Sequence, residues 1–555
     1  MAKNILTAWQ RLVGLLKLDK KDVIQVFYYA IFAGLVNLSL PLGIQAIINL
    51  IQGAQVSTSW IILVILVTLG VAFVGILQLM QIRIIENIQQ KIFTRASFEF
   101  AYRFPKIKMS ELRDYYPPEL ANRFFDTLNV QKGLSKLLVD FPAALLQIVF
   151  GLLLLSFYHP FFIIYGILLI LLIYIVFKFT VQKGLDTSLD ESKQKYKVAH
   201  WIQEVARAIV SFKLSGRTNH ALTKSDTLVS EYLVARESHF RVLVLQFVQM
   251  VGFKVLVTAG LLLIGGLLVL NQEMNIGQFV AAELIILLVI TSVEKLILGL
   301  ESFYDVLTSL EKLGQVVDKE LEPQEGEKPF KEDEVFTVEL DHVAYNVPGS
   351  TRKILDDVSL TITPTCKILI NGSNGSGKST LLHLISGIIE PDSGNVYVNE
   401  RKLNGINLNY YRSHVGQSLT EESPFEGTLL ENITFGDDSI PEEDIYWAIE
   451  KTGLTQFVRN QSLGIRATIY PEGKQISYTI AKKIVLARSI VRKPRLLILR
   501  DPLDQMDESE AARIMDFLID DSRPWALVIV SQDNKWLTRC SRIITIEKGK
   551  LISEN

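Results

Sequence analysis

The chain has 555 residues, enough for about two to four domains of ordinary size. Hydrophobic residues make up 49% of it and the mean hydropathy is +0.27, which excludes a wholly soluble or disordered protein. Charged residues make up 21%, which excludes a chain lying entirely in lipid, and the net charge of −2 excludes the bulk basic surface of a nucleic-acid-binding protein. The two cysteines, Cys366 and Cys540, are too few for a disulfide scaffold or a cysteine-based metal site.

The first residues indicate a helix at the membrane surface. Apolar residues recur at helical spacing over 5–18, which is typical of an amphipathic helix at the cytoplasmic interface, with a plain soluble helix as the alternative. The start lacks the apolar core and small-residue cleavage site of a signal peptide, so we expect the first residues to stay in the cytoplasm.

Six hydrophobic runs follow, and each is long enough to cross a membrane. A span needs about 20 apolar residues to cross about 30 Å of hydrocarbon. Buried helices of a soluble protein are the alternative, but six such long runs disfavour it. Pro41 and Gly43 interrupt the first run and favour a kink there. The expected spans are 23–50, 60–82, 138–158, 160–180, 242–270 and 277–300.

The basic residues predict the orientation of these spans. The connections 51–59, around 159, and 271–276 contain no lysine or arginine, whereas the connections 83–137 and 181–241 are rich in both. We therefore expect both termini and both long connections in the cytoplasm. The long connections are polar and helical in pattern, so the spans should continue well beyond the bilayer.

Charged side chains within the spans need partners or water. Lys254 and Glu294 are each about 20 residues from the loop around Met274, or about 30 Å of helix, so we expect them at similar depth near the inner leaflet. Glu283 lies nearer the outer side. We expect these groups to face protein or a cavity; snorkelling is the alternative for Lys254 and Glu294, and a direct pair between them is left open.

The pattern changes after the last span. Residues 315–334 are acidic, polar and broken by proline and glycine, which is typical of a linker. Short β-branched runs then alternate with helical segments, which predicts an α/β domain. The expected strands include 335–340, 367–372, 496–499, 526–531 and 542–547.

A phosphate-binding loop lies between the strand at 367 and the next helix. The run from Gly372 to Ser379 matches G-x-x-x-x-G-K-[ST] in the required strand–loop–helix context. Its glycines let backbone N–H groups surround phosphates at a helix N-terminus. We expect Lys378 to reach the β- and γ-phosphates and the Ser379 hydroxyl to ligate Mg²⁺. The expected nucleotide contacts are Gly372, Ser373, Asn374, Gly375, Ser376, Gly377, Lys378, Ser379 and Thr380.

With six spans, two long cytoplasmic connections and a P-loop domain, the chain resembles an ABC exporter half-transporter over nearly its whole length. The resemblance is closest to bacterial exporters of the toxin and peptide secretion (type I) type. It implies an all-α six-helix transmembrane domain over 1–314 and an α/β ATP-binding cassette over 335–555. It further implies ATP and Mg²⁺ as ligands, with Gln417 contacting both and Ser477 contacting the nucleotide.

The resemblance also implies partners and a location. We expect a homodimer, or a heterodimer with another half-transporter, as a multi-pass protein of a bacterial inner membrane in contact with lipid. A periplasmic adaptor is compatible with this family, and nucleic acid is not an expected partner. Short coupling helices are expected near 109–121 and 203–216, where such exporters press on their cassettes.

Two family motifs are altered in this sequence. The signature L-S-G-G-Q is replaced by Ile-Ser-Tyr-Thr-Ile at 476–480, so Tyr478 stands where close backbone approach is needed. The Walker B strand should end in Asp-Glu, which orient the metal shell and the attacking water. Here it ends in Arg500-Asp501-Pro502. Either Arg500 replaces the metal residue, or a shift by one makes Asp501 that residue and leaves Pro502 as the water partner.

Two further positions depart from the family. Gln532 stands where the switch histidine is expected, and it carries no full charge. Val347 takes the position of the adenine-stacking aromatic, and Tyr345 replaces it only if the strand shifts by two. Four losses around one pocket predict weak or absent hydrolysis, because removing single catalytic groups costs about 10²–10⁴ in rate. The alternative is that the remaining residues keep the site active.

Two functions are therefore open. The first is a subunit that couples ATP binding in a degenerate cassette to the export of a peptide, protein or lipid-like substrate. The second is a non-hydrolysing scaffold or regulatory subunit of a larger secretion or envelope complex. A fully competent partner subunit would not restore two intact sites. Each composite site joins one subunit's Walker motifs to the other's signature, so each site would still contain one altered half from this chain.

Overall fold

The computed structural model describes residues 7–52, 58–216, 218–331, 334–347 and 349–554. The described residues form two compact units. The helical unit comprises those within Met1–Pro105 and Tyr115–Lys319, and the α/β unit comprises those within Lys106–Asp114 and Glu320–Asn555. A short piece of the connection 83–137 thus belongs to the α/β unit.

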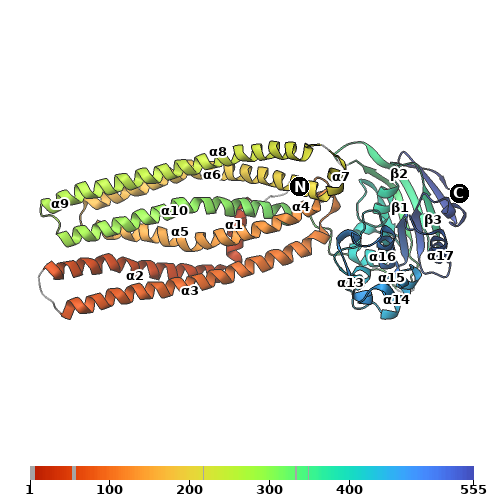
Figure 1. Cartoon of the computed structure of the whole chain (residues 1–555), viewed down its shortest axis with the longest axis horizontal. Coiled ribbons are helices and arrows are strands. Elements are labelled where there is room, and N and C mark those ends of the chain that lie inside the picture. Colours follow the sequence, from red (N-terminus) through yellow and green to blue (C-terminus); the bar gives the residue numbers. More distant parts are fainter. Residues whose placement is uncertain (1–6, 53–57, 217, 332–333, 348, 555) are drawn as a thin grey trace. The chain divides into compact units, whose positions relative to one another are not determined.

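Six long apolar helices build the helical unit, as the sequence predicts (Figure 1). Each is long and apolar enough to cross a membrane, and each coincides with one of the six expected spans. The expected span 138–158 runs two residues past the end of its helix at Ser156, and the expected span 160–180 starts one residue before its helix at Phe161. The chain turns over between Ser156 and Phe161, at the expected connection around 159. The helices are α2 (Lys20–Gln52), α3 (Thr58–Arg103), α5 (Asp126–Ser156), α6 (Phe161–Arg207), α8 (His220–Gly260) with α9 (Gly266–Leu270), and α10 (Ile276–Val317).

The helices extend beyond the apolar spans. For example, α3 has 46 residues and α6 has 47, about twice what a bilayer requires. Close packing of these extensions depends on small residues: a Cβ atom at Gly184 of α6 would overlap the ring of Tyr304 on α10. The expected extension of the spans is therefore confirmed.

The ends of the helical unit differ in detail from the expectation. Helix α1 (Ala8–Leu18) starts at a capping box formed by Thr7 and Gln10, and residues 5 and 6 of the expected helix lie outside the described range. Helix α2 is continuous through Pro41, and the kink expected there stays a prediction. The expected linker begins too early, because α10 continues to Val317, where its last turn still packs in the helical unit. Residues 332–333 of that linker lie outside the described range.

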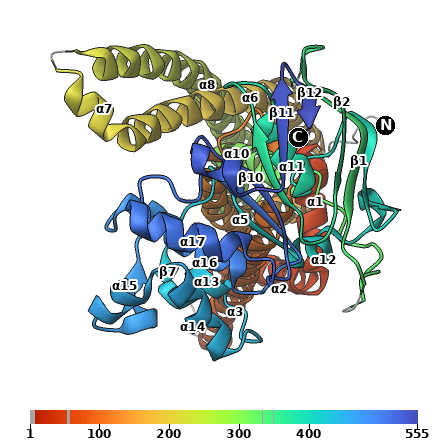
Figure 2. The ribbon, with the colours of Figure 1, turned by 90° about the vertical axis from the view of Figure 1, so that its right-hand side faces the viewer.

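The α/β unit contains a six-stranded sheet in the order β12-β11-β3-β10-β9-β6, in which the neighbours from β11 to β6 are parallel. A second, antiparallel sheet has the order β2-β1-β4-β5 (Figure 2). The parallel sheet consists of β3 (Lys367–Asn371), β6 (Val415–Ser418), β9 (Leu496–Arg500), β10 (Ala526–Val530), β11 (Arg542–Glu547) and the antiparallel edge strand β12 (Lys550–Glu554). The antiparallel sheet consists of β1 (Val338–Asn346), β2 (Lys353–Ile362), β4 (Ser393–Val398) and β5 (Arg401–Lys402).

Both faces of the parallel sheet are buried, which explains its apolar strands. In β3, Ile368 and Ile370 face one core, shared with the antiparallel sheet and α11 (Lys378–Ile385), whereas Leu369 faces the other. The second core is closed by α16 (Tyr478–Ile490) and α17 (Glu508–Ile519). Four expected strands are confirmed as β3, β9, β10 and β11. The strand expected at 335–340 is β1, which starts three residues later and continues to Asn346.

Candidate functional site

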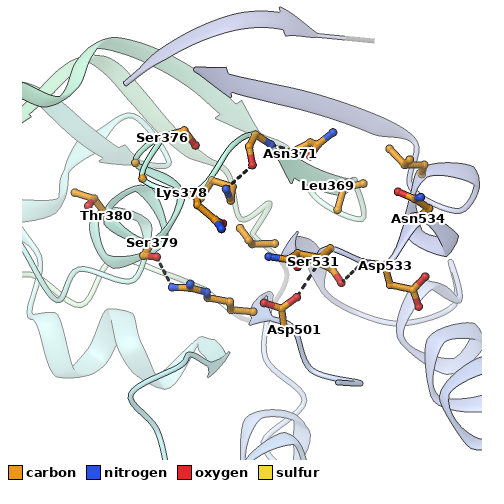
Figure 3. Close-up of a pocket in the computed structure, with 18 of the residues that line it drawn as sticks. Leu369, Asn371, Ser376, Lys378, Ser379, Thr380, Asp501, Ser531, Asp533 and Asn534 are labelled. Atoms are coloured by element: carbon orange, nitrogen blue, oxygen red, sulfur yellow. Dashed lines mark hydrogen bonds between the residues drawn. The ribbon is translucent and has the colours of Figure 1, made fainter. Parts of the chain in front are cut away.

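A pocket of about 370 Å³ opens where three parallel strands end (Figure 3). Asn371 ends β3, Val530 ends β10 and Arg500 ends β9, and the register of these neighbouring strands brings the three ends level. Ligands of α/β sheets bind at the carboxyl ends of the strands. The pocket lining contains all of the expected loop contacts except Ser373, together with Arg500, Asp501 and Gln532.

The loop after β3 has a shape that only glycine permits. Gly372, Gly375 and Gly377 have φ values of 146°, 78° and 106°. A Cβ atom at Gly377 would lie 2.7 Å from Leu355, and one at Gly372 would overlap the Ile546 carbonyl. Glycine at these positions turns the chain directly into α11, so the free N–H groups at the start of the helix lie at the pocket.

Lys378 is the first residue of α11 and crosses the mouth of the loop. Its Nζ donates to the carbonyl oxygens of Gly372, at 2.6 Å, and Ser373, at 2.8 Å. The pKa of Lys378 is lowered, first by partial burial and then by the positive charge of Arg500. Ser373 thus serves the site through its carbonyl. The ammonium is positioned to meet an anion held by the loop.

Ser376 supplies a second polar group to the pocket. The residue is 2% exposed, and its hydroxyl oxygen has no hydrogen-bond partner among the described residues. A buried hydroxyl without a partner is costly, so a ligand with acceptor oxygens would satisfy it.

The end of β9 brings Arg500 to the phosphate-binding loop. The Arg500 Nη1 atom donates to the Ser379 Oγ atom, the hydroxyl expected to hold the metal. Asp501 lies beyond the strand with φ of 43°, and its Oδ1 atom accepts from the Gln532 backbone N–H at 3.2 Å. The structure therefore places the guanidinium, and not the carboxylate, beside Ser379.

Three expected contacts do not line this pocket in the described part of the chain. Gln417 lies in β6, opposite Ile498 of β9. Ser477 caps α16, where its Oγ accepts from the Ile480 N–H at 3.3 Å. Tyr345 is 6% exposed within the core, and its ring is not positioned to stack on a nucleotide in this pocket.

Other lining residues were missed by the sequence analysis. Ser531, Asp533 and Asn534 follow β10 and border the pocket beside Gln532. The sequence offered one signal for these residues: they come directly after an apolar strand, and ligands of parallel sheets bind at the carboxyl ends of the strands. Asp533 already accepts the Lys535 N–H at 2.9 Å, so its carboxylate is partly engaged.

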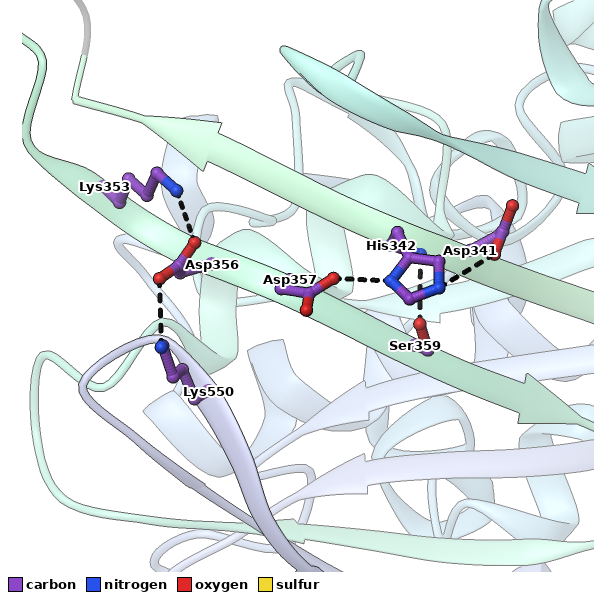
Figure 4. Close-up of polar contacts among 7 residues, drawn as sticks. All are labelled: Asp341, His342, Lys353, Asp356, Asp357, Ser359 and Lys550. Carbon is purple, nitrogen blue, oxygen red and sulfur yellow. Dashed lines mark hydrogen bonds and ion pairs between the residues drawn. The ribbon is translucent and has the colours of Figure 1, made fainter.

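A second group of polar contacts joins side chains of β1 and β2, with Lys550 of β12 at one end (Figure 4). His342 Nδ1 lies 2.6 Å from Asp357 Oδ1, and the Asp357 carboxylate raises the pKa of His342. Lys353 and Lys550 both pair with Asp356. Solvent-exposed pairs of this kind contribute little to stability and do not enclose a ligand.

Both units of the chain are similar to known protein families. The family model described as "ABC transporter transmembrane region" matches residues 23–293, and the model described as "ABC transporter" matches residues 355–504. A putative export ATP-binding/permease protein of Rickettsia bellii is 25% identical over 478 residues, which are 85% of this chain and 82% of that protein.

More distant similarities agree with this architecture. The toxin RTX-III translocation ATP-binding protein of Actinobacillus pleuropneumoniae is 25% identical over 393 residues, which are 70% of this chain and 55% of that protein. The chain thus spans about half the length of that relative. The solved structure of a bacterial Atm1-family ABC exporter with ATP bound has the same fold, with a TM-score of 0.85 at 14% identity over 97% of this chain and 95% of that one. The chain therefore belongs to the ABC transporters, as a half-transporter of exporter architecture with one six-helix membrane domain and one ATP-binding cassette.

Proposed function

We propose that the chain is one subunit of a dimeric membrane exporter whose cassette binds ATP but hydrolyses it slowly. One observation carries this proposal: an intact phosphate-binding loop faces a guanidinium at the place where the family has a metal-orienting carboxylate. ABC cassettes generally bind ATP with Mg²⁺. The loop, the Lys378 ammonium and the unpartnered Ser376 hydroxyl support the nucleotide-binding part.

The residues at the positions that should activate water also support slow hydrolysis, because they suit that role poorly. Asp501 is the only carboxylate that β9 delivers at its end, and the Gln532 N–H already engages it. Tyr478 occupies the signature position, is 48% exposed and directs its hydroxyl towards Asp504 Oδ2 at 3.4 Å. A bulky ring on this surface opposes close approach of a second cassette to the phosphates.

The wider context is proposed from the family and the sequence. We place the protein in a bacterial inner membrane, with both termini in the cytoplasm and lipid around the six helices. The expected assembly is a homodimer or a heterodimer with another half-transporter, and a periplasmic adaptor fits the toxin-exporter relatives. The proposed substrate is a peptide, protein or lipid-like molecule.

A second candidate is a non-hydrolysing scaffold or regulatory subunit of a secretion or envelope complex. The Arg500–Ser379 contact favours it as well, because a cation on the metal-binding hydroxyl would impair turnover. ATP-dependent substrate movement by the reconstituted chain would favour the exporter. Nucleotide binding without any movement would favour the scaffold.

The test is nucleotide binding and ATPase activity of the purified full chain in lipid nanodiscs. We expect measurable but weak ATP binding, with hydrolysis about 10²-fold or more below that of an intact family cassette. Lys378→Ala should abolish binding, whereas the control Lys402→Ala, on the exposed strand β5, should leave it unchanged. Unchanged binding in Lys378→Ala would refute the phosphate site, and rapid hydrolysis lost in the same variant would refute the degenerate cassette.

A further inference from the structure

The contact between Arg500 and Ser379 concerns the metal as well as hydrolysis. In this family the loop hydroxyl ligates Mg²⁺, and here Arg500 Nη1 donates to that oxygen from the end of a neighbouring strand. The two residues are 121 positions apart in the chain, and the fixed register of β9 and β10 holds the arginine in place. The guanidinium is part of the pocket wall and is not a freely moving surface group.

The residues around Ser379 do not suit a divalent cation. Arginine carries its charge at every accessible pH, so Mg²⁺ at the same hydroxyl would meet a fixed positive charge. The nearest replacement acid, Asp501, directs its Oδ1 atom to the Gln532 N–H. Gln417, the other expected metal contact, does not line the pocket among the described residues.

A guanidinium can perform part of the work of the metal. Mg²⁺ neutralises charge on the phosphates and bridges their oxygens. Arginine offers five N–H donors in a planar fork that fits two phosphate oxygens at once. One donor of Arg500 is used on Ser379, which orients the fork and leaves the other donors for a ligand. Ser379 then acts as a positioning residue for the arginine.

The pocket is lined by two cations, Lys378 and Arg500, and by two carboxylates, Asp501 and Asp533, each of which already accepts a backbone N–H. The charge of Arg500 contributes to the lowered pKa of Lys378, after burial. Two cations held close together repel each other until an anion lies between them. The pKa of Glu421, a further carboxylate, is lowered first by its hydrogen bond to His383, and Arg500 lowers it as well.

We propose that this cassette binds ATP in its metal-free form, with the Arg500 guanidinium taking the place of Mg²⁺ at the phosphates. The proposal rests on the nucleotide-binding part of the proposed function. It assigns a ligand class, a nucleoside triphosphate without a divalent cation, to a site whose relatives use the metal complex. It also explains why a complete phosphate-binding loop occurs beside an altered Walker B strand: the loop still holds phosphates, and the arginine takes the place of the metal.

The experiment is an equilibrium titration of the full chain in nanodiscs with radiolabelled ATP, in excess Mg²⁺ and in excess EDTA. We expect the unmodified chain to bind ATP in EDTA at least as tightly as in Mg²⁺, because the metal competes with Arg500 for the same oxygens. Lys378→Ala should lose binding in both buffers. The two conditions require no variant of Arg500, so folding of a mutant does not limit the result.

Two substitutions then assign the effect to the guanidinium. Arg500→Gln should weaken binding in EDTA by roughly tenfold or more, the usual size of a charged hydrogen bond, and Mg²⁺ should not restore it. Arg500→Asp should weaken binding in EDTA at least as strongly, because its carboxylate also repels the phosphates, and here Mg²⁺ should restore binding through the new carboxylate. The matched control is Arg492→Gln, which breaks a surface pair with Asp437 and should leave both titrations unchanged.

The outcomes separate this inference from the proposed function. Binding by the unmodified chain in Mg²⁺ but not in EDTA would overturn the metal-free site and leave ATP binding intact. Equal binding by the unmodified chain and Arg500→Gln in EDTA would also overturn it. A lack of ATP binding in both buffers would instead refute the proposed nucleotide-binding function itself.

Discussion

Lys254 on α8 and Glu294 on α10 form an ion pair within two membrane-spanning helices, with 2.5 Å between Nζ and Oε2. Their side chains are 34% and 32% exposed, so each charge is largely covered by protein. The sequence predicts similar depth for the two residues and leaves a direct pair open; the structure shows the pair. This charge pair joins the helices of the fifth and sixth spans by an interaction that lipid cannot replace.

We expect each single neutralisation, Lys254→Met or Glu294→Gln, to lower the melting temperature of the protein in detergent. Each leaves one charge without its partner in a largely apolar setting. The double variant should be less damaged than the sum of the singles, with a coupling of about 1 kcal/mol. Thermal unfolding of the four proteins gives this coupling.

Exchange of the two residues is the control for this pair. Lys254→Glu combined with Glu294→Lys keeps both charges and should recover most of the stability lost in either single charge reversal. Additive effects across the cycle, with no recovery in the exchanged variant, would show that the two side chains act independently.

The segment Lys106–Asp114, from the connection between α3 and α5, belongs to the α/β unit, where Arg113 adds a side-chain contact to the backbone hydrogen bonds of Lys106 and Lys108. Arg113 Nη2 donates to the Tyr345 hydroxyl at 2.6 Å and its guanidinium lies 5.6 Å from the ring centroid. Arg113→Ala should raise amide exchange of this segment roughly five- to tenfold, because a hydrogen bond of about 1 kcal/mol is lost. Hydrogen-exchange mass spectrometry of the full chain measures it.

Tyr345→Phe is the matched variant for this contact. It keeps the buried ring and removes only the hydroxyl, so exchange of the segment should increase by a smaller factor. ATP affinity should remain unchanged, because the ring does not line the pocket. A clear loss of ATP affinity in Tyr345→Phe would restore the stacking role that the sequence allowed.

Glu422 makes the stability of the cassette depend on pH. Burial raises the pKa of Glu422 to about 7, while its Oε1 atom accepts the Leu419 N–H at 3.0 Å. Between the ordinary glutamate pKa and about 7, the folded state therefore holds a proton that the unfolded chain has released, so stability falls as pH rises through this window. Glu422→Gln stays neutral and should gain melting temperature over the unmodified chain towards pH 7 and above. The exposed control Glu426→Gln should show no such trend.

The sequence predicts those features that depend on local pattern. Six apolar runs are enough to predict six spans, and the glycine loop from Gly372 to Gly377 is enough to predict a phosphate-binding loop. The start of β1 does not follow from composition, because pairing begins only where Val338 meets Ile362 and Val398. Val335 is β-branched like Thr337 and Val338 but is 63% exposed.

Contacts between residues far apart in the chain could not be predicted from the sequence. The position of Arg500 on Ser379 depends on the order and register of β3, β10 and β9, which no single segment encodes. The burial of Tyr345 also does not follow from alternation along β1, because the register shifts after Leu340 and the consecutive residues Val343, Ala344 and Tyr345 are all buried.

Restoring ATPase activity should require changes at all of the altered positions of the cassette. Arg500→Asp with Asp501→Glu supplies a metal carboxylate and a water partner, and Gln532→His supplies the switch side chain while its backbone N–H remains in place. In a homodimer these three changes still leave Tyr478 and Thr479 on the signature surface, so little ATPase activity should appear. Groups that act as a unit in catalysis show their effect only when all are present.

Replacing residues 476–480 by Leu-Ser-Gly-Gly-Gln in the same chain should allow two cassettes to close around Mg-ATP. It removes the Tyr478 ring and its contact with Asp504. We expect Mg²⁺-dependent ATPase activity only in this combined variant, at least about 10²-fold above the unmodified chain, and lost on Lys378→Ala. Phosphate release by purified protein in nanodiscs measures it, with the signature change alone as control. Strong activity in the unmodified chain would show instead that Asp501 and Gln532 suffice, and an ordinary active exporter would be the better account.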